Sequence, residues 1–224
     1  LGHNGAGKST TINMLLDFAR PTKGTIEVFG KDCQTDSVAA REHMGVLPEG
    51  YAVYDSLTGR EHIEFAMESK GVEGEPFDVL DRVDITHAAD RRAGGYSKGM
   101  AQRLVLGMAL VRDPDLLVLD EPSTGLDPNA RREIWSILLD LKKNTRTCLV
   151  LTTHYMEEAE KLCDHIQIMD QGSVLRQGSL EDLLEDGRAE KIIAFTLDAP
   201  RNPEPELSRS APFSVQWDPV AGRG

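Results

Sequence analysis

A glycine-rich segment at the start of the chain constrains both its fold and its chemistry. Residues 2–10 read Gly-His-Asn-Gly-Ala-Gly-Lys-Ser-Thr and fit the pattern G-x-x-x-x-G-K-[ST]. In such a loop the glycines let successive backbone N–H groups turn inward around phosphate oxygens, and the next helix points its positive end at them. We expect Lys8 to reach the β- and γ-phosphates of a nucleotide and the Ser9 hydroxyl to bind Mg²⁺; the alternative is an ordinary glycine-rich turn. The residues predicted to bind the nucleotide here are Gly2, His3, Asn4, Gly5, Ala6, Gly7, Lys8, Ser9 and Thr10.

The rest of the chain alternates between apolar runs and amphipathic stretches, which is typical of an α/β protein with a parallel sheet. Short strands are expected at 25–28, 44–47, 116–120, 147–152 and 166–170, and helices at 9–18, 98–111 and 129–143. The stretch from about 50 to 95 is charged and helical in pattern, and Thr58 followed by Glu61 has the spacing of a capping box. We therefore predict an α/β P-loop NTPase core with a mostly parallel sheet and an inserted helical subdomain.

This pattern divides the chain into three parts. The core is predicted at 1–49 and 107–186, with the helical subdomain at 50–106 between its two pieces. The remaining residues, 187–224, hold five of the chain's eleven prolines and are expected to be a loose or small accessory element. Because the glycine-rich loop starts at the second residue, we expect the strands that normally precede such a loop to lie upstream of Leu1.

Candidate catalytic residues follow two of the predicted strands. Asp120 and Glu121 end the apolar run that starts at Leu116, and His154 follows the run at 147–152. Strands of a parallel sheet end at one edge, beside the phosphate loop. There Asp120 can hold Mg²⁺ through water, Glu121 can orient or deprotonate an attacking water, and His154 can bond the γ-phosphate. Taken singly, an acidic strand end or a surface histidine is commonplace; the combination with the loop favours catalysis.

A second small-residue segment lies at 96–103, Tyr-Ser-Lys-Gly-Met-Ala-Gln-Arg. Ser97 and Gly99 at a helix start form another anion-binding cap, although in isolation a plain helix N-cap is the favoured interpretation. A second phosphate cap in one chain is redundant unless it serves a second copy of the nucleotide site.

Together these motifs resemble the ATP-binding subunit of an ABC transporter. The resemblance covers about residues 1–185, in the family's order, and rests on 2–10, 96–103, 116–122, Ser123-Thr124-Gly125-Leu126-Asp127 and His154. The glycine-rich loop and Tyr-Ser-Lys-Gly-Met are similar to the ABC-2 exporter subfamily, which includes daunorubicin-resistance-type drug and antibiotic exporters. Members of that group pair a single ATPase chain with a separate permease.

The resemblance implies ATP and Mg²⁺ as ligands and ATP hydrolysis as the activity. It implies a head-to-tail homodimer, in which Ser97, Gly99 and Met100 of one copy complete the site on Lys8 of the other, with Asp127 across the seam. It also implies an ABC-2 type permease as partner, an export function, and a place at the cytoplasmic face of the cell membrane. The aromatic side chain that stacks on adenine in this family is expected upstream of Leu1.

Two departures from the family pattern stand out. Glu49 occupies a position where members often carry a glutamine that contacts Mg²⁺ and senses the permease, and we expect Glu49 still to bind the metal. Lys98 and Met100 stand where the commoner form has Gly and Gln, which we interpret as subfamily variation.

Net charge and the length of the apolar runs limit the kinds of partner that the chain can bind. The net charge of −12 argues against nucleic acid, because a phosphate backbone requires clustered Lys and Arg. No apolar run approaches the roughly 20 residues that span a bilayer, so another chain is expected to carry any span. The alternatives are a non-transport ABC ATPase of DNA repair or the ribosome, an ATP-binding regulator without turnover, and a P-loop kinase or GTPase. The sequence does not identify the cargo.

Overall fold

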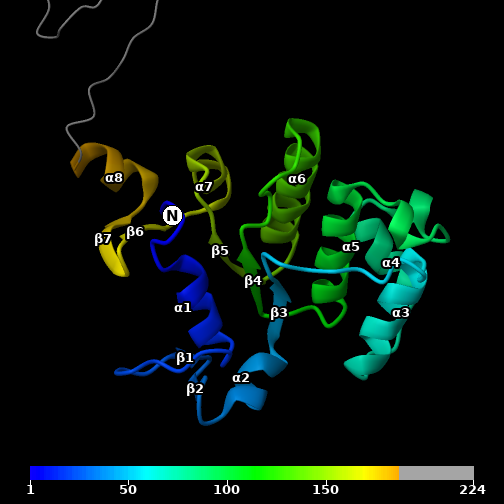
Figure 1. Ribbon diagram of the computed structural model, residues 1–224, viewed down its shortest axis with the longest axis horizontal. Coiled ribbons are helices and arrows are strands. Elements are labelled where there is room, and N and C mark those ends of the chain that lie inside the picture. Colours follow the sequence, from blue (N-terminus) through cyan, green and yellow to red (C-terminus); the bar gives the residue numbers. More distant parts are fainter. Residues whose placement is uncertain (187–224) are drawn as a thin grey trace, which may run out of the picture. The chain divides into compact units, whose positions relative to one another are not determined.

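The computed structural model describes residues 1–186 (Figure 1). The helices are α1 (Lys8–Leu15), α2 (Ser37–Glu42), α3 (Gly59–Ser69), α4 (Pro76–Arg82), α5 (Lys98–Leu110), α6 (Pro128–Asn144), α7 (Met156–Leu162) and α8 (Leu180–Asp186), with 3₁₀ turns at Thr86–Ala88 and Ala93–Gly95. The strands are β1 (Glu27–Val28), β2 (Lys31–Asp32), β3 (Met44–Leu47), β4 (Leu116–Asp120), β5 (Cys148–Thr152), β6 (Ile166–Asp170) and β7 (Ser173–Gly178). The predicted extension at 187–224 lies outside the described residues.

A parallel sheet of β3, β4 and β5 forms the centre of the fold, with β4 between the other two. All five residues of β4 are buried, as its unbroken apolar run predicts for a strand covered on both faces. Two antiparallel pairs, β1–β2 and β6–β7, accompany this sheet. The predicted α/β class is confirmed, and β3, β4 and β6 have the predicted bounds.

The two faces of β4 pack against different helices, because successive side chains of a strand point to opposite sides. Leu116 and Val118 pack in a cluster with Ile12 of α1. Leu117 and Leu119 pack in a larger cluster that is built from α3, α4, α5 and α6. Helices α1 and α5 therefore cover opposite faces of the sheet (Figure 1).

The helical subdomain begins with the predicted capping box. The Thr58 side chain accepts a hydrogen bond from the backbone N–H of Glu61, whose carboxylate accepts one from the backbone N–H of Thr58. Ile63 of α3 and Leu80 of α4 are fully buried in the same cluster as Leu119 of β4. Helix α5 runs without interruption across the predicted boundary between 106 and 107, so the subdomain and the core share one helix and one apolar cluster.

Helix α1 is shorter than predicted and ends at Leu15 instead of residue 18. Asp17 adopts a left-handed backbone conformation with φ 61°. The N–H groups of Phe18 and Ala19 both bond to the carbonyl oxygen of Asn13, which closes the last turn. A left-handed residue after the last turn is a common way to end a helix.

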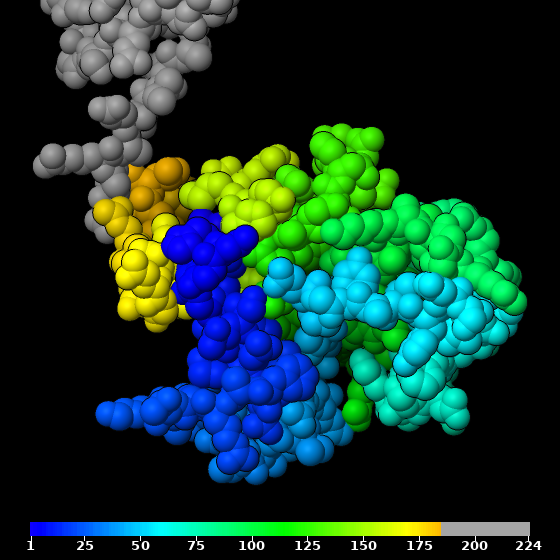
Figure 2. Space-filling model, in the orientation of Figure 1, coloured from blue at the N-terminus to red at the C-terminus, as the bar shows by residue number. Residues whose placement is uncertain are grey.

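The first residues lie between β5 and β6. The Leu1 amino group donates to the carbonyl of Gln167 at 2.7 Å, and the N–H of Met169 donates to the carbonyl of Leu1 at 2.7 Å. The N–H of Gly2 reaches the carbonyl of Thr153, just after β5. Figure 2 shows this segment, in dark blue, packed against the yellow β6–β7 hairpin. Within residues 1–186, no helix combines the length and apolar character needed to cross a bilayer.

Candidate active site

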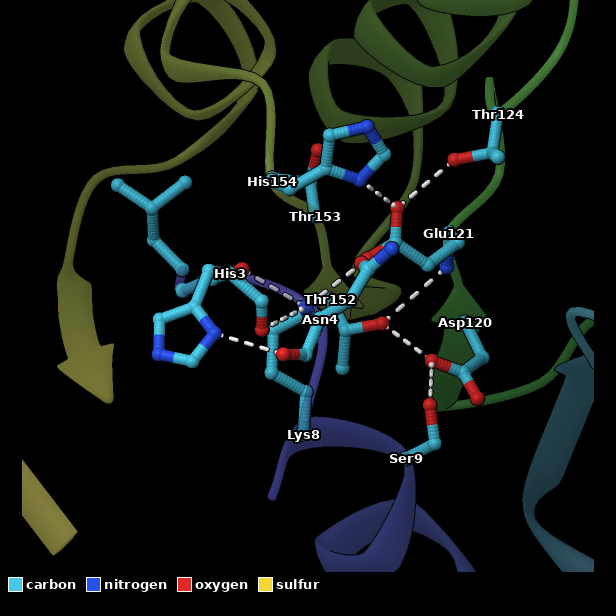
Figure 3. Close-up of polar contacts among 12 residues, drawn as sticks. His3, Asn4, Lys8, Ser9, Asp120, Glu121, Thr124, Thr152, Thr153 and His154 are labelled. Atoms are coloured by element: carbon cyan, nitrogen blue, oxygen red, sulfur yellow. Dashed lines mark hydrogen bonds and ion pairs between the residues drawn. The ribbon is translucent and has the colours of Figure 1, made fainter. Parts of the chain in front are cut away.

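The candidate active site forms where three segments meet at one edge of the sheet (Figure 3). Strands β4 and β5 are parallel and in register, with Asp120 opposite Thr152, so the residues that follow them emerge side by side. The loop of residues 2–10, which we call the phosphate loop, approaches the same edge through its bond from Gly2 to Thr153. The prediction that the two strand ends and this loop share one edge is confirmed.

The phosphate loop bends back on itself before α1. Gly7, the N-cap of α1, has φ 104°, a left-handed conformation that a side chain would disfavour. The N–H of Ala6 bonds to the carbonyl of His3, and the N–H of Gly172 in the β6–β7 turn bonds to the carbonyl of Ala6. Ala6 is buried, whereas His3, Asn4, Gly5 and Thr10 are exposed.

The His3 side chain joins the phosphate loop to β6. Its Nε2 lies 2.7 Å from a carboxylate oxygen of Asp170, and its Nδ1 lies 2.6 Å from the carbonyl oxygen of Asn4. Both partners accept hydrogen bonds, so the protonated ring, which donates from both nitrogens, satisfies both contacts. The pKa of His3 is accordingly raised, chiefly by the hydrogen bond to Asp170.

Lys8 is buried, with only 6% of its surface exposed, and its ammonium is fully partnered. The Nζ atom donates to the carbonyl oxygens of Gly2 at 2.8 Å and His3 at 3.2 Å. It also lies 3.1 Å from Oε1 of Glu121. A lysine ammonium has three N–H donors, and here each has an oxygen partner.

Glu121 is the most constrained group of the site. It is 6% exposed and holds φ 53°, an uncommon left-handed conformation for a residue with a side chain. One carboxylate oxygen pairs with Lys8, and the other accepts from Thr124 Oγ1 at 2.8 Å and from His154 Nδ1 at 2.7 Å. Its backbone N–H donates to the carbonyl and hydroxyl oxygens of Thr152, both at 3.1 Å.

These contacts set the ionisation of Glu121. Burial works to raise the pKa of its carboxyl group, but hydrogen bonds from Thr124, Lys8 and His154 outweigh burial and lower the pKa below its ordinary value. The carboxylate is therefore ionised at neutral pH and can accept a proton.

Oxygen ligands suited to Mg²⁺ lie beside this carboxylate. Asp120 is 6% exposed; one of its oxygens accepts from Ser9 Oγ at 3.2 Å and from the Thr152 hydroxyl. A hydroxyl and a carboxylate are the donor types that Mg²⁺ prefers, so Ser9 and Asp120 fit that ion. Glu49 follows β3 at the same edge and is exposed, and no hydrogen bond or ion pair holds it within residues 1–186; its role as a metal ligand stays a prediction.

His154 is held on two sides. While Nδ1 faces Glu121, the imidazole ring packs against the Tyr155 ring, with 4.1 Å between the ring centroids and 40° between the ring planes. The guanidinium carbon of Arg131, from α6, lies 4.1 Å from the centroid of the Tyr155 ring. Within residues 1–186, Nε2 has no hydrogen-bond partner. The contacts by which Tyr155 and Arg131 support His154 were not predicted from the sequence. The two residues are distant in sequence, and no local pattern links α6 to the segment that follows β5.

The segment 96–103, which we call the signature segment, starts α5. Ser97 is its N-cap, and its hydroxyl accepts from the N–H of Met100 at 3.2 Å. Asp127 similarly caps α6 by accepting from the N–H groups of Asn129 and Ala130. The structure brings together Lys8, Ser9, Asp120, Glu121 and His154, whereas the predicted nucleotide-binding residues Ser97, Gly99, Met100 and Asp127 make no hydrogen bond or ion pair with the phosphate loop within residues 1–186.

Comparisons with known proteins show the family of the chain. The model of the family "ABC transporter" matches residues 1–124. The "Nod factor export ATP-binding protein I" of Burkholderia orbicola is 40% identical over 190 residues, which cover 83% of this chain and 62% of that protein. The protein of the same name from Rhizobium sp. (strain N33) is 41% identical, over 99% of this chain and 73% of its own length. A solved structure described as the ATP-binding subunit of an ABC transporter superposes with a TM-score of 0.72 at 29% identity, over 83% of this chain and 79% of the other.

Proposed function

The chain belongs to the ABC transporter family of ATP-hydrolysing proteins, and we propose that it energises export of a substrate through a separate membrane permease. Glu121 carries this proposal, because its buried, ionised carboxylate lies between Lys8 of the phosphate loop and His154. The family match excludes the kinase and GTPase alternatives.

In the proposed reaction, backbone N–H groups of the phosphate loop and Lys8 bind the phosphates of ATP. All three donors of Lys8 already face oxygen atoms of the chain, so binding a phosphate requires Lys8 to exchange at least one of them. Exchanging Glu121 would free one carboxylate oxygen to accept a proton from the attacking water. His154 would hold the other oxygen through Nδ1–H and, as the imidazolium, would donate a second hydrogen bond from Nε2 to the γ-phosphate.

Ser9 and Asp120 would hold Mg²⁺, which neutralises charge on the β- and γ-phosphates when bound. The chain's own contribution is to fix both oxygen donors by the Ser9 to Asp120 hydrogen bond. Glu49 is proposed as a further ligand, from the strand next to β4.

A homodimer is proposed for the complete nucleotide site. Helix α1, which follows the phosphate loop, and helix α5, which carries the signature segment, cover opposite faces of the sheet. This arrangement supports a site in which Ser97, Gly99 and Met100 contact the nucleotide on Lys8 of a second copy, with Asp127 at the seam. Such an interface is self-complementary and closes as a two-fold dimer.

The dimer can be tested with the variant Glu121→Gln, in which slowed hydrolysis should preserve the ATP-bound form. Light scattering should show the mass of two chains with Mg²⁺ and ATP and of one chain with ADP. A single-chain mass under both conditions would refute the nucleotide-linked dimer.

Export through an ABC-2 type permease, at the cytoplasmic face of the membrane, is proposed from the relatives. Two proteins named for Nod factor export match at 40% and 41% identity, and the chain spans 62% and 73% of their lengths. These names favour transport over an ABC ATPase of DNA repair or translation. The proposal predicts that a neighbouring reading frame encodes a six-helix membrane protein. That protein should co-purify with this chain and raise its ATPase rate. A partner without membrane-spanning helices would favour the alternative.

A further inference from the structure

We propose that Lys98 is a positioning residue that connects the start of the signature segment's helix to Glu121 of the same chain, with Thr124 as the intermediate. This inference rests on the proposed ATP hydrolysis in assigning Glu121 its task. It concerns one of the two positions at which the signature segment departs from the commoner family form, where glycine has no side chain to make such a connection.

Two consecutive hydrogen bonds form the connection. The Lys98 ammonium, from the first residue of α5, donates to the backbone carbonyl oxygen of Thr124 at 3.0 Å. The Thr124 hydroxyl donates in turn to Oε2 of Glu121 at 2.8 Å. Thr124 is thus held at its backbone by the signature segment and acts through its side chain on the catalytic carboxylate.

The surrounding backbone leaves room for this lysine. Gly125 has φ 71°, and a Cβ atom built on it would lie 2.3 Å from the Lys98 ammonium nitrogen. The ammonium therefore occupies space that is open only because residue 125 is glycine. The start of α5 is itself held against α6, since a Cβ atom on Gly99 would lie 2.8 Å from the Ala130 side chain.

Lys98 also contacts the segment that joins the core to the helical subdomain. Tyr51, two residues after Glu49, donates from its hydroxyl to the carbonyl oxygen of Lys98 at 3.4 Å. A displacement of the helical subdomain that moves this turn of α5 would move the ammonium away from Thr124. The Thr124 hydroxyl would then bond Glu121 less well, which weakens one of the contacts that orient the carboxylate.

The exposed position of Lys98 allows two other roles: a solvated surface lysine, or a direct contact with a nucleotide on a second copy. A double-mutant cycle separates them, because residues that act through one another do not combine additively. The variants are Lys98→Met, Thr124→Val and the double substitution, with Lys98→Arg and Thr124→Ser as conservative rescues and Lys143→Met as the control for loss of an exposed lysine.

We expect Lys98→Met to lower kcat by about 3–10-fold, the effect of one lost hydrogen bond, with KM for ATP changed by less than about 2-fold. Lys98→Arg should restore most of the rate, and Lys143→Met should not change it. In the Thr124→Val background, Lys98→Met should have little further effect. Rate losses that multiply would show that Lys98 acts independently of Thr124, and an unchanged kcat in Lys98→Met would show that it is a surface lysine; either outcome overturns the proposal.

A second measurement needs no hydrolysis. At one fixed pH, the carbon-13 chemical shift of the Glu121 carboxyl group should change in both Lys98→Met and Thr124→Val, because each weakens the hydrogen bond that the Thr124 hydroxyl donates to this carboxylate. An unchanged Glu121 chemical shift in Lys98→Met would refute the connection even in a protein that releases no phosphate. Absence of phosphate release by the parent protein would instead refute the proposed function.

Discussion

The phosphate loop and the signature segment have similar sequences, yet only the phosphate loop has its lysine buried among partners of the same chain. Each places small residues at the start of a helix, where N–H groups can bind an anion. In the phosphate loop, the buried Lys8 has three oxygen partners, one of them Glu121, the proposed general base. In the signature segment, Ser97 and Lys98 are exposed, and the Ser97 hydroxyl caps its own helix.

This difference suggests separate tasks: the residues around Glu121 act on the nucleotide of their own chain, and Ser97 acts on the nucleotide of a second chain. The groups around Glu121 already balance one another's charge, so changes there should alter turnover or nucleotide affinity directly. The Ser97 hydroxyl accepts from Met100 and still has its own proton to donate outward. Changes of the Ser97 side chain should therefore matter only when a second chain supplies the nucleotide.

The largest effect is expected from Glu121→Gln, which removes the proton acceptor but keeps the shape of the side chain. Turnover should fall by roughly 10²–10⁴-fold while ATP binding is retained. Phosphate release and an ATP titration measure the two quantities, and Glu160→Gln on α7 is a matched control at an exposed glutamate. Hydrolysis at the parent rate would show that Glu121 is not the general base.

Ser97→Asp tests the other side of the comparison. Aspartate is as good an N-cap as serine, so the midpoint of thermal unfolding should change little. The new carboxylate cannot donate a hydrogen bond and would face the phosphates of the nucleotide on the second copy, a repulsion of several kcal/mol. ATP-dependent dimerisation should be lost, and turnover should fall by about 10²-fold or more.

Ser97→Asn provides the matched control, because its amide caps the helix without adding a charge. It should retain much more turnover than Ser97→Asp. Normal dimerisation and activity in Ser97→Asp would show that the signature segment does not approach the nucleotide.

Lys8→Ala should act on binding more than on turnover. Loss of a charged hydrogen-bond donor to phosphate is expected to weaken ATP affinity by about 10–100-fold, corresponding to about 1.5–3 kcal/mol. Isothermal titration measures this change, and Lys143→Ala, at an exposed lysine of α6, should leave the affinity unchanged. Equal ATP affinity in parent and Lys8→Ala protein would contradict the assignment of the phosphate loop.

The same variant should change how stability depends on pH. The pKa of Glu121 is lowered in the folded chain, so its contribution to the free energy of unfolding is present above the unfolded carboxyl's pKa and is lost as pH falls through the folded value. Lys8 is one of the groups that lower this pKa. Without it, the folded pKa should rise toward the unfolded value, and urea unfolding should lose less stability on acidification than in the parent.

Local sequence signals predicted much of this arrangement. The apolar run at Leu116 has the bounds of β4, and the Thr58 capping box starts α3 where predicted. Strand β7 was missed because five of its six residues are exposed, so it lacks the apolar pattern by which strands are recognised. The contact of Lys8 with Glu121 follows from tertiary packing, which brings together residues more than a hundred positions apart that share no local pattern.

The smallest effect is expected from Thr58→Ala in the helical subdomain, which removes the capping box of α3. The free energy of unfolding should fall by about 1 kcal/mol, the usual value of an N-cap, and Thr58→Ser should restore it. ATP affinity should not change, because Thr58 contacts none of the residues around Lys8. Since Ile63 of α3 and Leu119 of β4 share one apolar cluster, the loss should appear in a single cooperative urea transition. Two separate transitions would instead show that the helical subdomain unfolds on its own, and the boundary predicted near residue 50 would then mark an independent folding unit.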